Sequence, residues 1–127
     1  MENEQSSGLA RIWVGEDGIC RIIWAPGAEV TLQDAQEAMA AYKKISKGKR
    51  LPLFIDTKTM RSLSREARRY YASQEAAASA SAAAIIVGTP VSKVLGNFYL
   101  GLSNPLLPSR LFSSEDEALA WLKGYVE

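Results

Sequence analysis

The segment Leu51-Pro-Leu-Phe-Ile-Asp56 runs directly into Thr57-Lys-Thr-Met-Arg-Ser-Leu-Ser64 and then into a helical pattern. A short apolar run that ends in a carboxylate predicts a buried central strand, and the polar residues behind it predict a loop. Open α/β sheets place their working residues outside the carboxyl ends of such strands. We therefore expect the functional site in and just after this loop.

The length and composition of the chain predict one domain. Its 127 residues can bury roughly two-thirds of the unfolded surface, so no metal or disulfide is needed for folding. We expect a flexible tail over residues 1–8 and a single α/β domain over residues 9–127. The 15 Lys and Arg nearly balance the 14 Asp and Glu, which argues against nucleic acid and anionic membranes as partners.

The sequence also predicts a compartment and excludes several kinds of chemistry. A single cysteine, Cys20, an acidic start and the lack of a long apolar run indicate a cytoplasmic protein without a membrane segment. The chain contains no histidine, so Ser-His and Cys-His nucleophiles and the usual zinc ligand sets are absent. We expect no enzyme activity, no metal and no cofactor.

The rest of the chain alternates between predicted strands and predicted amphipathic helices. Arg11–Val14 and Ile19–Trp24 alternate around turn residues and predict a hairpin. The predicted order is ββαβαβαβα, a mixed sheet that is antiparallel at its start and parallel through its third, fourth and fifth strands. The later strands are predicted at Ala82–Val87 and Arg110–Phe112. The helices are predicted at Thr31–Lys47, Ser64–Gln74, Pro90–Leu102 and Ser114–Tyr125.

Five segments carry a resemblance to a known family. They are Asp56-Thr57, Ser64-Arg-Glu-Ala-Arg68, Val91-Ser-Lys-Val-Leu-Gly-Asn-Phe98 with Arg110-Leu-Phe112, and the helix with Trp121. From Leu9 onward the chain resembles the anti-sigma-factor antagonist or STAS fold, and more closely small stand-alone bacterial STAS-like proteins without assigned activity. The resemblance implies a single STAS-like α/β domain that works as a regulatory or protein-interaction module.

The resemblance also implies a candidate switch. In phospho-switched STAS proteins a serine directly follows an aspartate at the start of the second helix, and the kinase is also the partner. The matching residue here is Thr57 after Asp56, so Asp56, Thr57 and Ser64 are candidate phosphorylation or partner-binding residues. This sequence lacks the family's Gly-Leu-Gly turn. The alternative is that Asp56 and Thr57 satisfy backbone donors and Ser64 caps a helix.

A run of cations follows the same strand, with only Glu66 opposing it. Together with Thr89 at the end of the next strand, these cations are candidates for holding an anion or an acidic partner segment. They are equally what a solvated helix face presents. The cations are Lys58, Arg61, Arg65, Arg68 and Arg69.

Two functions therefore remain open. The first is a non-enzymatic interaction module that binds a protein partner through the Asp56–Arg69 surface, with phosphorylation as its control. The second is a module that binds a nucleotide or another anionic small molecule at the same mouth. The exposed hairpin edge, with Trp13 and Ile23 on its outer face, also predicts a homodimer.

Overall fold

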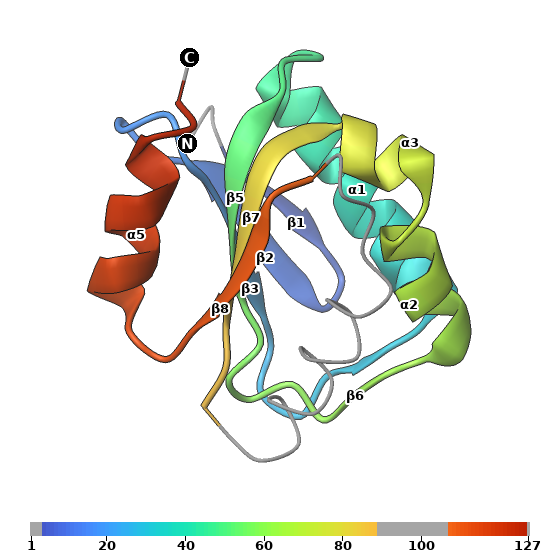
Figure 1. The fold of residues 1–127 in the computed structure, drawn as a ribbon. Coiled ribbons are helices and arrows are strands. Elements are labelled where there is room, and N and C mark those ends of the chain that lie inside the picture. Colours follow the sequence, from blue (N-terminus) through green and yellow to red (C-terminus); the bar gives the residue numbers. More distant parts are fainter. Residues whose placement is uncertain (1–3, 89–106, 127) are drawn as a thin grey trace.

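The computed structural model describes residues 4–88 and 107–126, and it shows a six-stranded sheet between two helical layers (Figure 1). The first three strands are antiparallel, and the last four, starting from β3, are mutually parallel. The predicted mixed sheet is thereby confirmed. The spatial order is β1 (Glu4–Ser7), β2 (Ala10–Val14), β3 (Cys20–Trp24), β5 (Leu51–Asp56), β7 (Ala80–Ile86) and β8 (Ser109–Phe112).

The central strand β5 is covered on both faces, as its continuous apolar run predicts. Leu53 and Ile55 face one core, and Phe54, which is 2% exposed, faces the other. On the neighbouring strand β7, Ala83 and Ala84 are buried in opposite cores. The small side chains of β7 let helices approach the sheet closely from either side.

The first residues depart from the prediction. Glu4–Ser7 form strand β1 rather than part of a flexible tail, with Gln5 opposite Ile12 and Ser6 opposite Arg11. Pairing of this edge strand depends on backbone hydrogen bonds, which polar side chains do not prevent. The predicted tail over residues 1–8 is therefore wrong from Glu4 onward.

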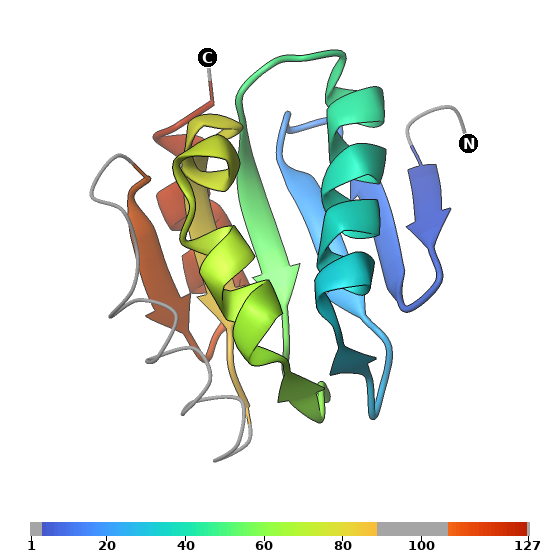
Figure 2. The same cartoon turned by 90° about the vertical axis from the view of Figure 1, so that its right-hand side faces the viewer.

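One face of the sheet is covered by α1 (Leu32–Ser46) together with two short helices (Figure 2). The predicted capping box at the start of α1 is confirmed. Asp34 N–H donates to Thr31 Oγ1 at 3.2 Å, and Thr31 N–H donates to the Asp34 carboxylate at 2.9 Å. The helix ends at Lys47, which takes a left-handed conformation with φ 55°.

The helix predicted after Ser64 is split into α2 (Arg65–Tyr71) and α3 (Gln74–Ala78). Ser73 lies at the break: its hydroxyl donates to the Tyr70 carbonyl at 2.6 Å, and its oxygen accepts from Ala76 N–H at 3.2 Å. One serine thus closes the first helix and caps the second.

The opposite face is covered by α5 (Glu115–Lys123), capped as predicted by Ser114 (Figure 1). Ala118 and Leu122 are fully buried against this face. The helix predicted over Pro90–Leu102 lies outside the described residues. None of the described helices has the length and hydrophobicity needed to cross a membrane.

Candidate functional site

The loop Thr57–Ser64 lies at the carboxyl end of β5, where the sequence predicts the site. It contains the two-residue strand β6 (Ser62–Leu63), which pairs with β4 (Glu29–Val30) in a small parallel ladder. Further backbone hydrogen bonds connect the loop to the segment around β4. They include Gly27 N–H to the Thr59 carbonyl (2.8 Å), Arg61 N–H to the Ala28 carbonyl (2.8 Å) and Ser64 N–H to the Val30 carbonyl (2.9 Å).

Thr57 is turned inward. Its side chain is buried, with the residue only 7% exposed, and its hydroxyl donates to the Ile86 carbonyl at 2.8 Å. The backbone N–H of Thr57 donates to the same carbonyl at 3.0 Å. Thr57 therefore joins the ends of β5 and β7, and a kinase would reach its hydroxyl only after this contact opens.

Asp56 is also engaged within the protein. One carboxylate oxygen accepts the backbone N–H of Lys58 at 2.9 Å, and the other lies 3.7 Å from Lys58 Nζ. The stem of Lys58 crosses Gly88 so closely that a Cβ on Gly88 would lie 2.9 Å from Lys58 Cγ. Glycine at the end of β7 thus makes room for the lysine that pairs with Asp56.

Ser64 has the structural role that the alternative interpretation assigns to it. Its oxygen accepts the N–H of Ala67 at 3.1 Å and caps α2. The side chain is half-buried. Three of the predicted site residues, Asp56, Thr57 and Ser64, therefore each make a hydrogen bond to the backbone within the fold.

The cations differ from these residues. Lys58, Arg61, Arg65 and Arg69 are exposed, and Arg68 is half-buried. Among the described residues, Arg61, Arg65 and Arg69 take part in no ion pair. Arg65 and Arg69 are one helical turn apart and share a face of α2, with Arg61 at the preceding loop. Thr89, the last predicted site residue, lies outside the described residues.

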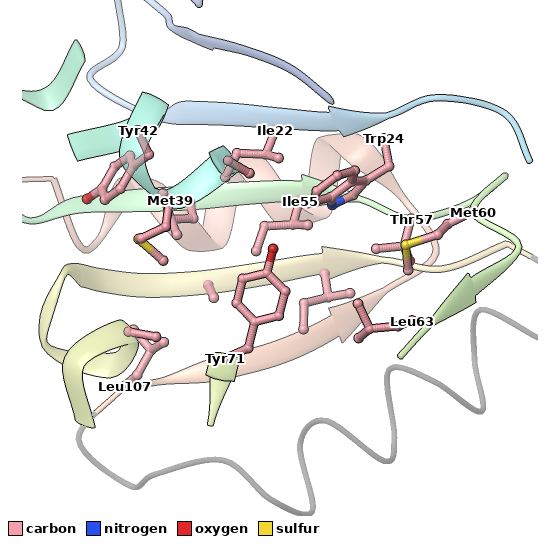
Figure 3. Close-up of a pocket in the computed structure, with 15 residues that line it drawn as sticks. Ile22, Trp24, Met39, Tyr42, Ile55, Thr57, Met60, Leu63, Tyr71 and Leu107 are labelled. Carbon is pink, nitrogen blue, oxygen red and sulfur yellow. The ribbon is translucent and has the colours of Figure 1, made fainter. Parts of the chain in front are cut away.

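Behind the loop lies a narrow apolar cavity of about 70 Å³ between the sheet and the helices α1, α2 and α3. Figure 3 shows Trp24, Met39, Met60 and Tyr71 pointing into it. Sequence reasoning did not place the loop residues Met60 and Leu63 here. Their signal was available, because they are the apolar residues in an otherwise polar segment and so are expected to face inward.

The described part of the chain shows neither a cluster of potential metal ligands nor a reactive thiol. No group of three or more acidic or cysteine side chains there could hold a metal ion. Cys20 is fully buried, and burial raises the pKa of its thiol to about 12. The thiol therefore stays protonated at neutral pH and is a poor nucleophile.

The outer face of the β2–β3 hairpin carries the residues behind the homodimer prediction. Trp13 and Ile23 are both half-buried there, and the Arg11 guanidinium lies 4.6 Å from the centre of the Trp13 ring. Cations over aromatic faces partly shield them from water. The homodimer stays a prediction.

Residues 12–126 match the model of a family described as Domain of unknown function (DUF7793). The chain belongs to this family. No curated protein matches it. The DUF7793 assignment agrees with the expectation of a STAS-like protein without assigned activity.

Two solved structures are similar to this DUF7793 chain. One is an uncharacterised protein of the DUF3478 family with a SpoIIAA-like fold from Shewanella loihica PV-4, with a TM-score of 0.63 and 17% identity over 89% of this chain and 91% of that chain. This similarity confirms the predicted STAS-like fold. The other is a protein of unknown function from Arthrobacter sp. FB24, with 36% identity over 87% of this chain and 96% of that chain and a TM-score of 0.36.

Proposed function

We propose that this chain is a non-enzymatic interaction module that binds an acidic segment of a protein partner. The binding surface is the basic surface formed by Arg61, Arg65 and Arg69, with Lys58 at its border. The observation that carries the proposal is the contrast between the three exposed arginines, which lack ion pairs among the described residues, and the hydrogen-bonded side chains of Asp56, Thr57 and Ser64.

Arginine is suited to this task. Its planar guanidinium binds a carboxylate through two parallel hydrogen bonds. Because the guanidinium is only weakly hydrated, it loses little hydration free energy when a partner covers it. Arg61 lies in the loop and its backbone N–H is hydrogen-bonded to the Ala28 carbonyl, and Arg65 lies in the first turn of α2. Fixed positions lower the conformational entropy that binding must overcome.

Phosphorylation of Thr57 would control this surface indirectly. A phosphate adds about −1.5 to −2 charges and cannot fit where the Thr57 hydroxyl contacts the Ile86 carbonyl at 2.8 Å. The side chain would have to leave this position, and the loop that carries Arg61 would move with it. We infer that such a switch would act by releasing the loop.

An anionic small molecule at the same mouth has less support. The cavity behind the loop is apolar and narrow, and none of the described residues that line it offers a charge to a phosphate or nucleotide. The exposed arginines present a surface, which suits an extended partner better than a compact ligand.

A pull-down and a thermal-shift screen together distinguish the two functions. The parent protein and an Arg65→Gln/Arg69→Gln variant would each be immobilised and exposed to cytosol from the source cells. Both purified proteins would also be screened by thermal shift against nucleotides and acidic metabolites. A ligand that binds only the folded state raises the melting temperature. A protein that binds the parent and not the variant supports the proposal. A melting shift from an anionic metabolite that is lost in the variant would favour the small-molecule function.

A further inference from the structure

A second groove lies at the other end of the sheet from the Thr57–Ser64 loop. It has a volume of about 600 Å³, which is within the range of ligand-binding clefts. Its lining residues come from the turn between β2 and β3, the end of α1, the start of β5 and the carboxyl-terminal end of the described chain. Figure 1 shows these segments at one end of the sheet.

The floor of the groove is apolar. Val14, Ile45 and Leu51 contribute from three different elements and are half-buried, and Val126 is 38% exposed. Val126 is the most exposed large apolar side chain among the described residues. An exposed valine beside three other aliphatic residues leaves apolar surface that a ligand can cover.

The rim of the groove is cationic. Lys47, Lys49 and Arg50 line it, and no acidic residue is among its described lining residues. Arg50 donates to the Ala80 carbonyl at 3.1 Å, whereas Lys47 and Lys49 are exposed and take part in no ion pair within the described chain. The ammonium groups of Lys47 and Lys49 are therefore available to bind an anion.

Four lysines lie at or near the carboxyl end of α1. Cations in the last turn of a helix compensate its negative end, and Lys43 and Lys44 are in that turn of α1. Lys43 also pairs with Glu75 at 3.2 Å. Lys47, the C-cap residue of α1, and Lys49 also lie near this negative end, and both line the groove.

The walls of the groove are held in place. On the hairpin side the Arg21 guanidinium donates to both carboxylate oxygens of Asp17, at 2.7 and 2.8 Å. On the opposite side the backbone N–H of Leu51 donates to the Tyr42 hydroxyl at 3.0 Å. A preformed site loses less conformational entropy when a ligand binds.

We propose that this groove binds a small amphipathic acid, meaning a molecule with an aliphatic or aromatic body and a carboxylate. The body would cover the floor of Val14, Leu51 and Val126, and the carboxylate would lie between Lys47 and Lys49. The cationic rim would select for the carboxylate, and the apolar floor would select for the body. The site is independent of the basic surface proposed above for a protein partner.

The test uses octanoate, 1-octanol and acetate as probes. Amide chemical shifts of the ¹⁵N-labelled full chain would be followed during titration with each. We expect octanoate to shift the amides of Val14, Lys47 and Val126 together, in a saturable way. Octanol lacks the charge and acetate lacks the body, so both should bind at least about ten-fold more weakly.

Two charge-matched double variants locate the site. Lys47→Gln/Lys49→Gln should weaken octanoate binding at least about ten-fold, whereas Arg65→Gln/Arg69→Gln, which removes the same two charges at the other end, should leave it unchanged. Val126→Ser should weaken octanoate without changing the melting temperature. Equal binding of octanoate and octanol, no saturable shifts, or loss in the Arg65/Arg69 variant alone would each overturn the proposal.

Discussion

The inner and the outer parts of the Asp56–Arg69 region differ in what their polar side chains contact. In the inner part, Asp56 accepts a hydrogen bond from the backbone N–H of Lys58, and the Thr57 hydroxyl donates to the Ile86 carbonyl. In the outer part, Arg61, Arg65 and Arg69 are exposed and take part in no ion pair within the described residues. A polar residue beside a strand end is therefore stronger evidence of function when the fold leaves its charge without a partner.

The largest expected effect comes from a residue that belongs to neither part. Phe54→Ala should lower the free energy of unfolding by about 3–5 kcal/mol, since it empties a fully packed site in the central strand. Phe54 is 2% exposed and packs against the α5 core. Urea denaturation measures this loss. Binding per folded molecule should equal that of the parent, and a selective loss of binding would place the surface on the α5 side.

The inner part is tested at Thr57. Thr57→Glu should lower the free energy of unfolding by about 3 kcal/mol, because it places a charge in a buried position and removes the hydrogen bond to Ile86. Thr57→Val keeps the shape and should cost only about 1–2 kcal/mol. Urea denaturation of both variants compares them. If Thr57→Glu were as stable as the parent, Thr57 would be accessible enough for direct phosphorylation.

The buried hydroxyl of Tyr42 should make the stability of the protein depend on pH. Tyr42 donates to the Ser79 carbonyl at 2.7 Å and accepts from Leu51 N–H, and burial raises the pKa of its phenol to about 12. The unfolded phenol titrates near 10, so its contribution to stability is complete below pH 10 and is lost as pH rises towards 12.

Tyr42→Phe should therefore cost about 1–3 kcal/mol at pH 7, because Leu51 N–H loses its acceptor. The difference between parent and variant should shrink above pH 10. The Cys20 thiol, whose pKa burial also raises to about 12, titrates in both proteins and does not affect the comparison. Thermal unfolding from pH 7 to 11 provides the measurement, and a constant difference across that range would show that the phenol is not buried.

A smaller effect is expected at Ser64. Ser64→Ala should cost about 1 kcal/mol by removing the cap of α2, whereas Ser64→Asp, which also caps, should stay near the parent. Urea denaturation of the two variants distinguishes a capping role from a role in recognition. Should Ser64→Asp fold normally and lose partner binding, Ser64 would belong to the working surface.

The fold could be predicted where the determinants are local. The limits of β5 follow from one apolar run, and the start of α1 follows from Thr31 and Asp34, three residues apart. Strand β1 could not be predicted, because Gln5 and Ser6 carry no apolar alternation. The break at Ser73 was missed for a similar reason, since a single serine is compatible with a continuing helix.

The location of the site could be predicted from the sequence, but which of its polar side chains are buried could not. The strand end located the region, yet the burial of Thr57 depends on Ile86, 29 residues away along the chain. The conformation of the loop likewise depends on pairing with β4, a strand of only two residues. Contacts between distant residues thus determine which polar groups remain available, and neither spacing nor composition encodes them locally.

The basic surface itself should contribute almost nothing to stability. Arg65→Gln/Arg69→Gln changes only exposed side chains without ion pairs in the described structure, so the free energy of unfolding should change by less than about 0.5 kcal/mol. Urea denaturation of this variant beside the parent tests this point. A large loss of stability would mean that these arginines have a structural role after all.

The most direct test is a calorimetric titration at low and at high salt, in which the protein captured by the immobilised parent is purified and titrated into three proteins: the parent, Arg65→Gln/Arg69→Gln and Lys47→Gln/Lys49→Gln. Both variants lose two charges, so they differ only in where the charges lay. We predict that the arginine variant binds at least about ten-fold more weakly at low salt, with a smaller difference at high salt. The lysine variant should bind like the parent. Equal affinity of all three proteins, or a loss confined to the lysine variant, would contradict the basic surface as the site of partner binding.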